Sequence, residues 1–282
     1  MQLHLKRVPV KDGPMTDEAW LQYMSEAYLP FTSQFSLYLQ YMQQLQTTIR
    51  YHVPECRRVG DFGMGPGLAA AHLLSAFPEI EEYHGFEYLR GLTELGAREL
   101  PPVGNAVNRG VLKPYEGSDL SQALSLSSPL ELDAIVSVNV IYIIKDDAGR
   151  QQFLENVRHH LAKDGVAIIA STMEPFARIS SYTSFLLARE SAFQFGRYYR
   201  GEANATEIRR FFKAIQAMTQ WSARIGSEVK LTHDCMLELI GRSGLRQMDR
   251  SQAFYTPGVL QPLTRLNMNF AGGVQYVLGR RP

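Results

Sequence analysis

The residues best suited to chemistry gather in one short turn, Asp61-Phe62-Gly63-Met64-Gly65-Pro66-Gly67. The pattern predicts a strand before the turn, from Arg57 to Phe62, and a helix after it, from Leu68 to Phe77. Glycines let the backbone take positive φ angles and approach a ligand without a Cβ in the way. The first turn of the following helix adds unpaired N–H groups. The spacing therefore predicts a ligand-binding turn at the end of a strand.

Glu87 is the second residue with a predicted chemical role. It stands 20 residues past Gly67 and ends another predicted strand, from Glu82 to Glu87. A carboxylate at that place can accept hydrogen bonds from both hydroxyls of a ribose. The pair of features therefore indicates a ligand that contains a nucleoside.

The turn distinguishes between two kinds of nucleoside ligand. The dinucleotide fingerprint needs a third Gly or an Ala where this chain has Leu68. Pro66 also lacks the N–H that a pyrophosphate cradle would use. Asp61, two residues before Gly63, is unsuited to a phosphate but suits a cationic ammonium group. The turn favours an amino-acid ammonium over a phosphate.

These motifs resemble those of the class I S-adenosylmethionine-dependent methyltransferases. Asp61, Gly63, Gly65 and Gly67 match the family's acid-x-Gly-x-Gly-x-Gly turn, and Glu87 matches its ribose-binding acid. The resemblance implies S-adenosylmethionine as the cofactor.

Three further segments carry the resemblance, which covers residues 55–172 and 230–280. They are Asp133 to Ile144 for the fourth strand, Leu161 to Gly165 for the lead into the fifth strand, and Leu231 to Gly244 for the helix before the last hairpin. The family implies an α/β fold, with a Rossmann-like, seven-stranded, mostly parallel sheet and helices on both faces.

The resemblance suggests three parts of the chain. Residues 1–54 are predicted to form an N-terminal helical cap. Residues 55–172 and 230–282 are predicted to form the cofactor-binding domain, and residues 173–229 a helical lid insert. That insert is too long and too aromatic to be a simple connection between strands.

The predicted elements alternate between strands and helices. The helices expected are Thr16 to Tyr51 with a break at Pro30, Leu89 to Leu100 ended by Pro101-Pro102, Asp147 to Ala162, and Thr232 to Ser243. The further strands expected are Ala106 to Leu112, Leu132 to Ile144, Val166 to Thr172, Leu245 to Tyr255 and Val274 to Gly279. This alternation is typical of a parallel sheet covered on both sides.

One place departs from the family pattern. The family often has an Asp after the third strand that contacts the adenine amine, and Asn108 to Leu112 contains no acid. Adenine contact is therefore expected from the backbone and apolar side chains of Val111 and Leu112.

Methyl transfer needs little beyond correct positioning of the reactants. Asn139 and Tyr142 lie at the end of the predicted fourth strand, and ligands of open α/β sheets bind outside the carboxyl ends of strands. Asn139 either accepts a hydrogen bond from the cofactor's ammonium or is a buried residue satisfied by the backbone. The segment Asn139-Val140-Ile141-Tyr142 does not match the Asn-Pro-Pro-Tyr motif of DNA-modifying family members.

Aromatic residues complete the set of candidate catalytic residues. Phe176 follows the fifth strand, where its ring face would stabilise a sulfonium cation. Tyr28 and Tyr182, like Tyr142, are hydroxyl-bearing candidates for the same rim. Packing in the core is the alternative role for each of them.

Composition limits the classes of partner. The 282 residues are 45% hydrophobic, and 29 basic against 28 acidic residues leave a net charge of +1. That balance gives no electrostatic footprint for nucleic acid or for a membrane surface. The two cysteines, Cys56 and Cys235, form neither a disulfide framework nor a zinc signature. With no secretory signal in Met1 to Val10, we expect a cytoplasmic enzyme of small-molecule metabolism without a metal, nucleic acid or membrane partner.

Three functions follow in order of preference. The first is methyl transfer to a small-molecule acceptor in a lidded apolar pocket. The second is intramolecular cyclisation of S-adenosylmethionine to azetidine-2-carboxylate, with release of methylthioadenosine. The third is a non-catalytic binding protein of the same fold, which the intact Asp61–Gly67 turn argues against.

Overall fold

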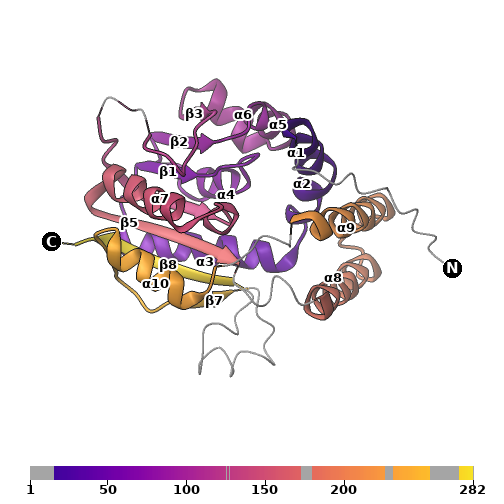
Figure 1. Cartoon of the computed structure of the whole chain (residues 1–282). Coiled ribbons are helices and arrows are strands. Elements are labelled where there is room, and N and C mark those ends of the chain that lie inside the picture. Colours follow the sequence, from indigo (N-terminus) through magenta and orange to yellow (C-terminus); the bar gives the residue numbers. More distant parts are fainter. Residues whose placement is uncertain are drawn as a thin grey trace.

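A computed structural model of the chain describes residues 16–124, 126, 128–172, 180–225, 231–254 and 273–281 (Figure 1). One mixed sheet forms its centre. The strands are β1 (Arg58–Phe62), β2 (Glu82–Glu87), β3 (Leu112–Glu116), β4 (Leu132–Val138), β5 (Leu161–Thr172), β6 (Leu245–Gln247), β7 (Gln252–Phe254) and β8 (Gly273–Arg280). Their order is β3-β2-β1-β4-β5-β8-β6, and β7 also pairs with β8.

The first five strands are mutually parallel, and β8 runs antiparallel to its neighbours. β6 pairs with the end of β8 and β7 pairs with its start, so the two short strands share one edge. The sheet is therefore seven strands wide, as the sequence predicts, but the expected strand from Leu245 to Tyr255 is divided in two. A parallel sheet that reverses only at one side confirms the predicted α/β, Rossmann-like class.

Helices cover both faces of the sheet. One face packs against α3 (Ser36–His52), α4 (Leu68–Ala76), α5 (Leu92–Glu99) and α6 (Pro101–Asn108), and the other against α7 (Asp147–His160) and α10 (His233–Arg242). Alternate residues of β4 enter the two cores: Ala134 and Val136 face the first, and Ile135 the second. Burial on both faces explains why β4 is a nearly continuous apolar run.

The N-terminal segment is helical, but its break lies later than predicted. Thr16 caps α1 (Asp17–Tyr23), which continues through a π-helical turn η1 (Met24–Tyr28) into α2 (Leu29–Thr32). Pro30 lies inside α2 and does not end the helix. The π turn widens the backbone where the proline ring would press on the preceding turn. The break comes after α2, because Phe35 is extended before α3 begins.

The prediction of a strand from Ala106 to Leu112 is wrong. Pro101 and Pro102 end α5 as expected, but they also begin α6, where a missing N–H has no cost. Val103 and Ala106 are the buried residues of α6 and lie three positions apart, which is a helical spacing. The third strand is β3, Leu112–Glu116.

The fourth strand is also shorter than predicted. β4 ends at Val138, and Asn139 takes a φ of 61°, which breaks the strand. A 3₁₀ turn η2 (Ile141–Ile143) follows. β5 begins at Leu161 rather than Val166, with a shift in register against β4 between Leu132 and Ala134.

The insert between β5 and α10 is helical in its described residues, with α8 (Ser180–Tyr199) and α9 (Ala205–Ile225). α9 packs against α1, η1 and α2, so the insert and the N-terminal helices lie together beyond the arrowhead of β5 (Figure 1). The division into residues 1–54, 55–172 with 230–282, and 173–229 stays a prediction.

Within the described residues, every helix is too short or too polar to cross a lipid bilayer.

Candidate functional site

The glycine turn lies at the carboxyl end of β1. Gly63, Gly65 and Gly67 all have positive φ angles, of 83°, 57° and 84°. The N–H groups of Gly63 and Met64 donate to the carbonyl of Phe86, at 2.8 and 3.0 Å. The turn is thereby fixed against the end of β2.

The three glycines serve different purposes. A Cβ on Gly63 would come within 2.2 Å of Val140, and one on Gly67 within 3.1 Å of Val103. A Cβ on Gly65 would meet no atom of the described residues within 4 Å. Gly63 and Gly67 are therefore needed for packing inside the protein, whereas Gly65 faces open space that a ligand can enter.

Glu87 ends β2 and reaches the turn. Its carboxylate accepts hydrogen bonds from the N–H of Gly65 at 2.8 Å and from the N–H of Leu89 at 3.0 Å. Burial raises the pKa of this carboxyl, and the backbone donors oppose that rise. The two motifs that the sequence singles out, the glycine turn and Glu87, are in direct contact.

Asp61 is a buried acid beneath the turn, with 2% of its surface exposed. The hydroxyl of Tyr83 donates to its carboxylate at 2.8 Å. Burial raises the pKa of Asp61 to about 7, the Tyr83 hydrogen bond lowers it, and the Glu87 charge raises it further. A buried acid in this setting is strongly favoured to pair with a cationic ligand group.

Tyr28 is coupled electrostatically to Tyr142 and to the two carboxylates. Tyr28 ends η1 and Tyr142 lies in η2. Burial raises the pKa of Tyr142 to about 12. Burial raises the pKa of Tyr28 further, and the charges of Tyr142, Asp61 and Glu87 add to the rise. Both phenols are neutral at pH 7 and can donate hydrogen bonds.

Tyr23 is a site residue that sequence reasoning missed. Its ring lies 5.9 Å from the ring of Tyr28, and burial together with Tyr142 and Tyr28 raises its pKa. Tyr23 and Tyr28 are five positions apart, a spacing that does not share a face in an α-helix. The π turn η1 brings the two rings together. The sequence would have predicted this pair only if a π-helical spacing of five residues had been considered.

Asn139 lies at the carboxyl end of β4. Its backbone N–H donates to the carbonyl of Ala170 in β5 at 2.8 Å. Two residues earlier, the Ser137 hydroxyl donates to the carbonyl of Phe62 at 2.7 Å and joins β4 to the end of β1. The left-handed conformation of Asn139 turns the chain into η2, which carries Tyr142.

The structure separates Val111 and Leu112 from the rest of the predicted site. Leu112 pairs with Tyr83, whereas Glu116 pairs with Glu87. Four residues of strand span about 13 Å, so Leu112 lies at the opposite end of β2 from the glycine turn. The expectation rested on a third strand that ended at Leu112, and that strand is wrong.

Acids do follow the true third strand. Glu116 accepts hydrogen bonds from the N–H groups of Gly91 and Thr93, both at 3.0 Å, and caps α5. Asp119 accepts from the N–H of Ser121 at 3.0 Å and orders the turn after β3. The Gly117-Ser118-Asp119 turn signal would have placed this acid correctly if the strand had been predicted at its true position.

A hollow of about 360 Å³ opens beside this turn at the carboxyl ends of β2 and β3. Its lining includes Phe86, Tyr115, Glu116, Ser118, Asp119 and Leu124. It combines aromatic and apolar walls with polar groups at the edge next to Glu87, which suits a flat heterocycle.

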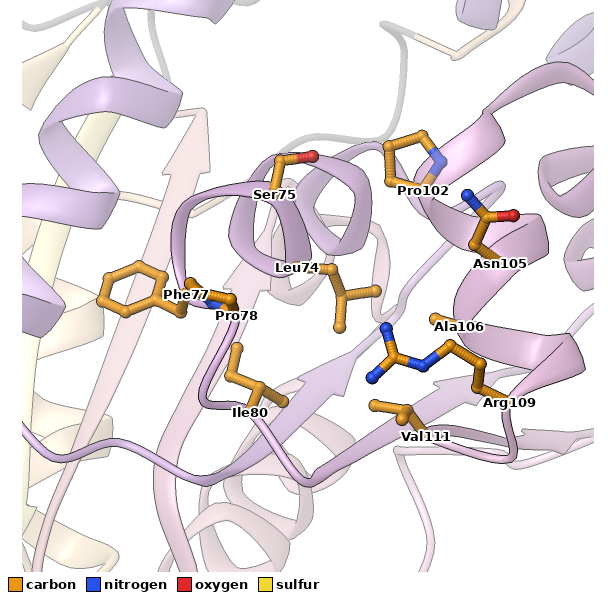
Figure 2. A pocket seen from close by; sticks show the side chains of 10 residues that line it. All are labelled: Leu74, Ser75, Phe77, Pro78, Ile80, Pro102, Asn105, Ala106, Arg109 and Val111. Atoms are coloured by element: carbon orange, nitrogen blue, oxygen red, sulfur yellow. The ribbon is translucent and has the colours of Figure 1, made fainter.

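A second hollow, of about 270 Å³, lies at the other end of the strands. Figure 2 shows its lining, with Arg109 from the end of α6 directed toward Leu74 and Val111. The N–H of Tyr83 donates to the Val111 carbonyl at this amino end of β2. It contains none of the acids or glycines of the candidate site.

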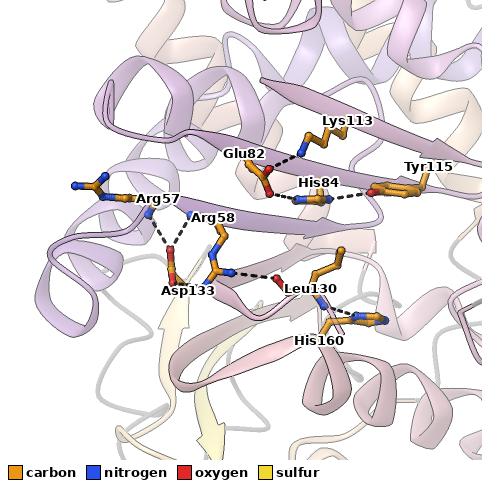
Figure 3. A network of polar contacts seen from close by, with 9 residues as sticks. All are labelled: Arg57, Arg58, Glu82, His84, Lys113, Tyr115, Leu130, Asp133 and His160. Carbon is orange, nitrogen blue, oxygen red and sulfur yellow. Dashed lines mark hydrogen bonds and ion pairs between the residues drawn. The ribbon is translucent and has the colours of Figure 1, made fainter. Parts of the chain in front are cut away.

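The amino ends of the strands also hold a network of polar contacts (Figure 3). The Asp133 carboxylate accepts from the N–H groups of Arg57 and Arg58, at 2.9 and 2.7 Å. Asp133 therefore binds two backbone donors, as Glu87 does, but far from the glycine turn.

Two predicted residues cannot be compared with this geometry. Phe176 lies outside the described residues, and Tyr182 lies in α8 at a position where only the backbone is described. No cluster of His, Cys, Asp and Glu suited to a metal ion occurs among the described residues.

No family model and no curated protein matches this chain. Solved structures do match it, at low sequence identity. The methyltransferase domain of bacterial CtHen1-C is 13% identical with a TM-score of 0.54, over 88% of this chain and 100% of that domain.

Two further solved structures match this chain with similar TM-scores. A putative O-methyltransferase from Nostoc punctiforme is 15% identical with a TM-score of 0.55, over 92% of this chain and 59% of that one. A possible exported protein from Bordetella parapertussis is 13% identical with a TM-score of 0.54, over 95% and 80%. Together with the strand order, these likenesses show that the chain has the class I S-adenosylmethionine-dependent methyltransferase fold.

Proposed function

We propose that the protein binds S-adenosylmethionine at the glycine turn and transfers its methyl group to a small-molecule acceptor. The observation that carries this proposal is the contact between Glu87 and Gly65 at 2.8 Å, beside open space. In this contact, the carboxylate that would bind the ribose lies next to Gly65, whose Cβ position has no atom of the described residues within 4 Å. Two of the structures that share the fold are described as methyltransferases.

The three parts of the cofactor fit three groups of residues. Glu87 would bind the ribose, and the hollow after β3 would hold the adenine, with Asp119 at its polar edge. Asp61 would pair with the ammonium group, since it is a buried acid near a ligand-accessible turn. Because β3 is Leu112–Glu116, Asp119 is the acid that would take the adenine-contacting role after the third strand.

The reacting methyl group would lie near Tyr28 and Tyr142. Their phenols stay protonated at neutral pH, so they would orient an acceptor as hydrogen-bond donors and not act as bases. The helices that carry Tyr23 and Tyr28 pack against α9 of the insert, and together they would exclude water from the site. An acceptor enclosed in this way would be small.

One observation favours a second candidate, the cyclisation of S-adenosylmethionine. That reaction needs a neutral α-amine, which attacks the Cγ atom while the bond from Cγ to sulfur breaks and methylthioadenosine leaves. Asp61 has a pKa of about 7 and lies where the ammonium would bind, so its carboxylate is a suitable acceptor for the amine proton.

The products distinguish the candidates. We would incubate the protein with S-adenosylmethionine alone, then with a small-molecule cell extract, and identify the nucleosides by mass spectrometry. S-Adenosylhomocysteine that forms only with extract would support methyl transfer. Methylthioadenosine that forms without extract, faster than with the Glu87→Gln variant, would replace the proposal with cyclisation. A protein that binds S-adenosylhomocysteine but forms neither product would indicate the non-catalytic alternative.

A further inference from the structure

Asp61 and Tyr83 form a buried pair on the face of the sheet that α3 and α4 cover. Val59 pairs with Tyr83, and Asp61 pairs with Gly85, so all four side-chain positions lie on one face. Tyr83 is fully buried, and its hydroxyl bridges two positions along the sheet to the Asp61 carboxylate at 2.8 Å. The bond joins β1, which carries the glycine turn, to the middle of β2.

The ionisable groups around Asp61 are acids and phenols. Tyr83 and Glu87 face it from β2, and Tyr28 faces it from η1. Behind the Tyr83 ring lie Tyr38 of α3 and Cys56. On the other side, β4 presents the apolar Val136 in register with Asp61. Among the described residues, the charge of Asp61 is stabilised by the Tyr83 hydroxyl alone, with no cation beside it.

We propose that Tyr83 is a positioning residue whose hydroxyl holds the Asp61 carboxylate ionised and oriented for the ammonium group of the ligand. This inference rests on the proposed binding of S-adenosylmethionine. Neither sequence motif contains Tyr83, which acts on the ligand only through Asp61. Ligand binding is then coupled to the loss of one proton from Asp61.

The direction of the coupling follows from the charges. A cationic group binds the ionised carboxylate, so affinity falls as Asp61 becomes protonated. Because the pKa of Asp61 is about 7, this loss begins near neutral pH. A hydrogen bond to a charged group contributes about one pKa unit or more, so Tyr83→Phe should weaken binding about tenfold below pH 7. The loss should shrink to about threefold or less at pH 8, where Asp61 ionises in both proteins.

The experiment compares two ligands and four proteins. Binding of S-adenosylhomocysteine and of 5′-methylthioadenosine is measured by calorimetry between pH 5.5 and 8. Methylthioadenosine keeps the ribose and adenine but lacks the ammonium. The proteins are wild type, Tyr83→Phe, Asp61→Asn and Tyr276→Phe. Tyr276 is the matched control, because it is equally buried and its hydroxyl is bonded, at 2.8 Å, to His233 on the other face of the sheet.

We expect Tyr83→Phe to shift the pH profile for S-adenosylhomocysteine upward, with methylthioadenosine unaffected and Tyr276→Phe like wild type. Asp61→Asn should abolish the pH dependence. A Tyr83→Phe profile that coincides with wild type would overturn the role of Tyr83. If wild type binds neither ligand, the proposed function itself fails, which is a different result.

A measurement on wild type alone keeps the test independent of variant folding. Calorimetry at pH 6 in buffers of different ionisation enthalpy reports the protons released on binding. S-Adenosylhomocysteine should release nearly one proton, and methylthioadenosine none. Equal release with both ligands would exclude Asp61 as the group that meets the ammonium, and Tyr83 would lose its role with it.

Discussion

The carboxylate of Glu190 in α8 caps the N-terminus of α3 through Ser36, 154 positions earlier in the chain. It accepts hydrogen bonds from the Ser36 N–H at 3.1 Å and from the Ser36 hydroxyl at 2.6 Å, with no exposed surface of its own. Gln194, one turn later, donates to the carbonyl of Gln34 at 2.8 Å. These bonds attach the helical insert to the start of α3 and to the turn before it, next to the helices that carry Tyr23 and Tyr28.

The first prediction concerns this attachment. Glu190→Ala leaves the first N–H of α3 buried without a partner, which should cost about 1–3 kcal/mol of unfolding free energy. Urea denaturation measures the loss. The control is Glu207→Ala, because Glu207 is exposed and caps its own helix by accepting from the Asn204 N–H at 2.9 Å. The control should cost about 1 kcal/mol or less, and equal losses would contradict the importance of the buried attachment.

The second prediction separates backbone strain from ligand contact. Gly65 and Gly110 have positive φ angles of 57° and 69°, and a Cβ at either position would have no atom of the described part of the chain within 4 Å. Replacement by Ala should cost each about 1–2 kcal/mol of stability, since both adopt a left-handed conformation. Only Gly65→Ala should weaken S-adenosylhomocysteine binding, by at least roughly tenfold, because its Cβ enters the ligand space. Isothermal calorimetry measures the affinity of both variants for S-adenosylhomocysteine. Unchanged affinity in Gly65→Ala would show that the ligand does not bind at this turn.

A third prediction compares two carboxylates that each accept from two backbone N–H groups, of which Asp133 also pairs with the Arg58 guanidinium at 3.6 Å. Glu87→Gln and Asp133→Asn each replace a carboxylate with a neutral amide, which weakens the hydrogen bonds that two backbone N–H groups donate to it. Both should lose similar stability, about 1 kcal/mol. Glu87→Gln should also weaken nucleoside binding about tenfold or more through the lost ribose contact. If Asp133→Asn reduced affinity as much, the effect would be one of stability and not of contact.

A fourth prediction concerns Asp61 in the ligand-free protein. Its pKa is raised from 3.8 to about 7, so between these values the folded state holds a proton that the unfolded state has lost. Stability should therefore decrease as pH rises from about 4 to 7 and stay lower above that. Asp61→Asn removes this cost, so it should melt at a higher temperature than wild type at pH 8 and at nearly the same temperature at pH 4. A variant that melts lower at pH 8 would show that the Asp61 charge is already compensated.

A fifth prediction concerns acid stability. His160 is buried beside Phe62 and Phe86, and burial, aided by His159, His84 and Arg280, lowers its pKa from 6.5 to about 4. The unfolded state takes up the proton first as pH falls, so stability should decrease between pH 6.5 and 4, by up to about tenfold in the unfolding equilibrium per pH unit. His160→Gln should flatten this part of the profile. His159→Gln, at the exposed neighbouring position, should leave the profile close to that of wild type.

The sequence alone determined the elements whose signals are local. The glycine turn, the strand that ends at Glu87 and the apolar run of β4 depend on neighbouring residues, because φ preference and burial on both faces are local properties. Chain order then predicts that the turn and Glu87 lie at the carboxyl edge of a parallel sheet, and in the structure the two are in contact at 2.8 Å.

Prolines misled the prediction where they had two possible roles. Pro101 and Pro102 end one helix and begin another, and the prediction that they only end a helix moved the third strand away from Leu112–Glu116. Pro30 continues a helix because a π turn precedes it. Neither role can be read locally, because packing against the rest of the chain selects it.

Only the tertiary structure decided which distant residues share the site. Tyr28 and Tyr142 are more than a hundred positions apart, and they are coupled electrostatically because η1 packs on α9 while η2 follows the end of β4. The same is true of Tyr83 and Asp61, whose bond depends on the register of β1 against β2. The type of a residue determines whether it can form hydrogen bonds or apolar contacts. Which partner it contacts is determined by sheet register and helix packing.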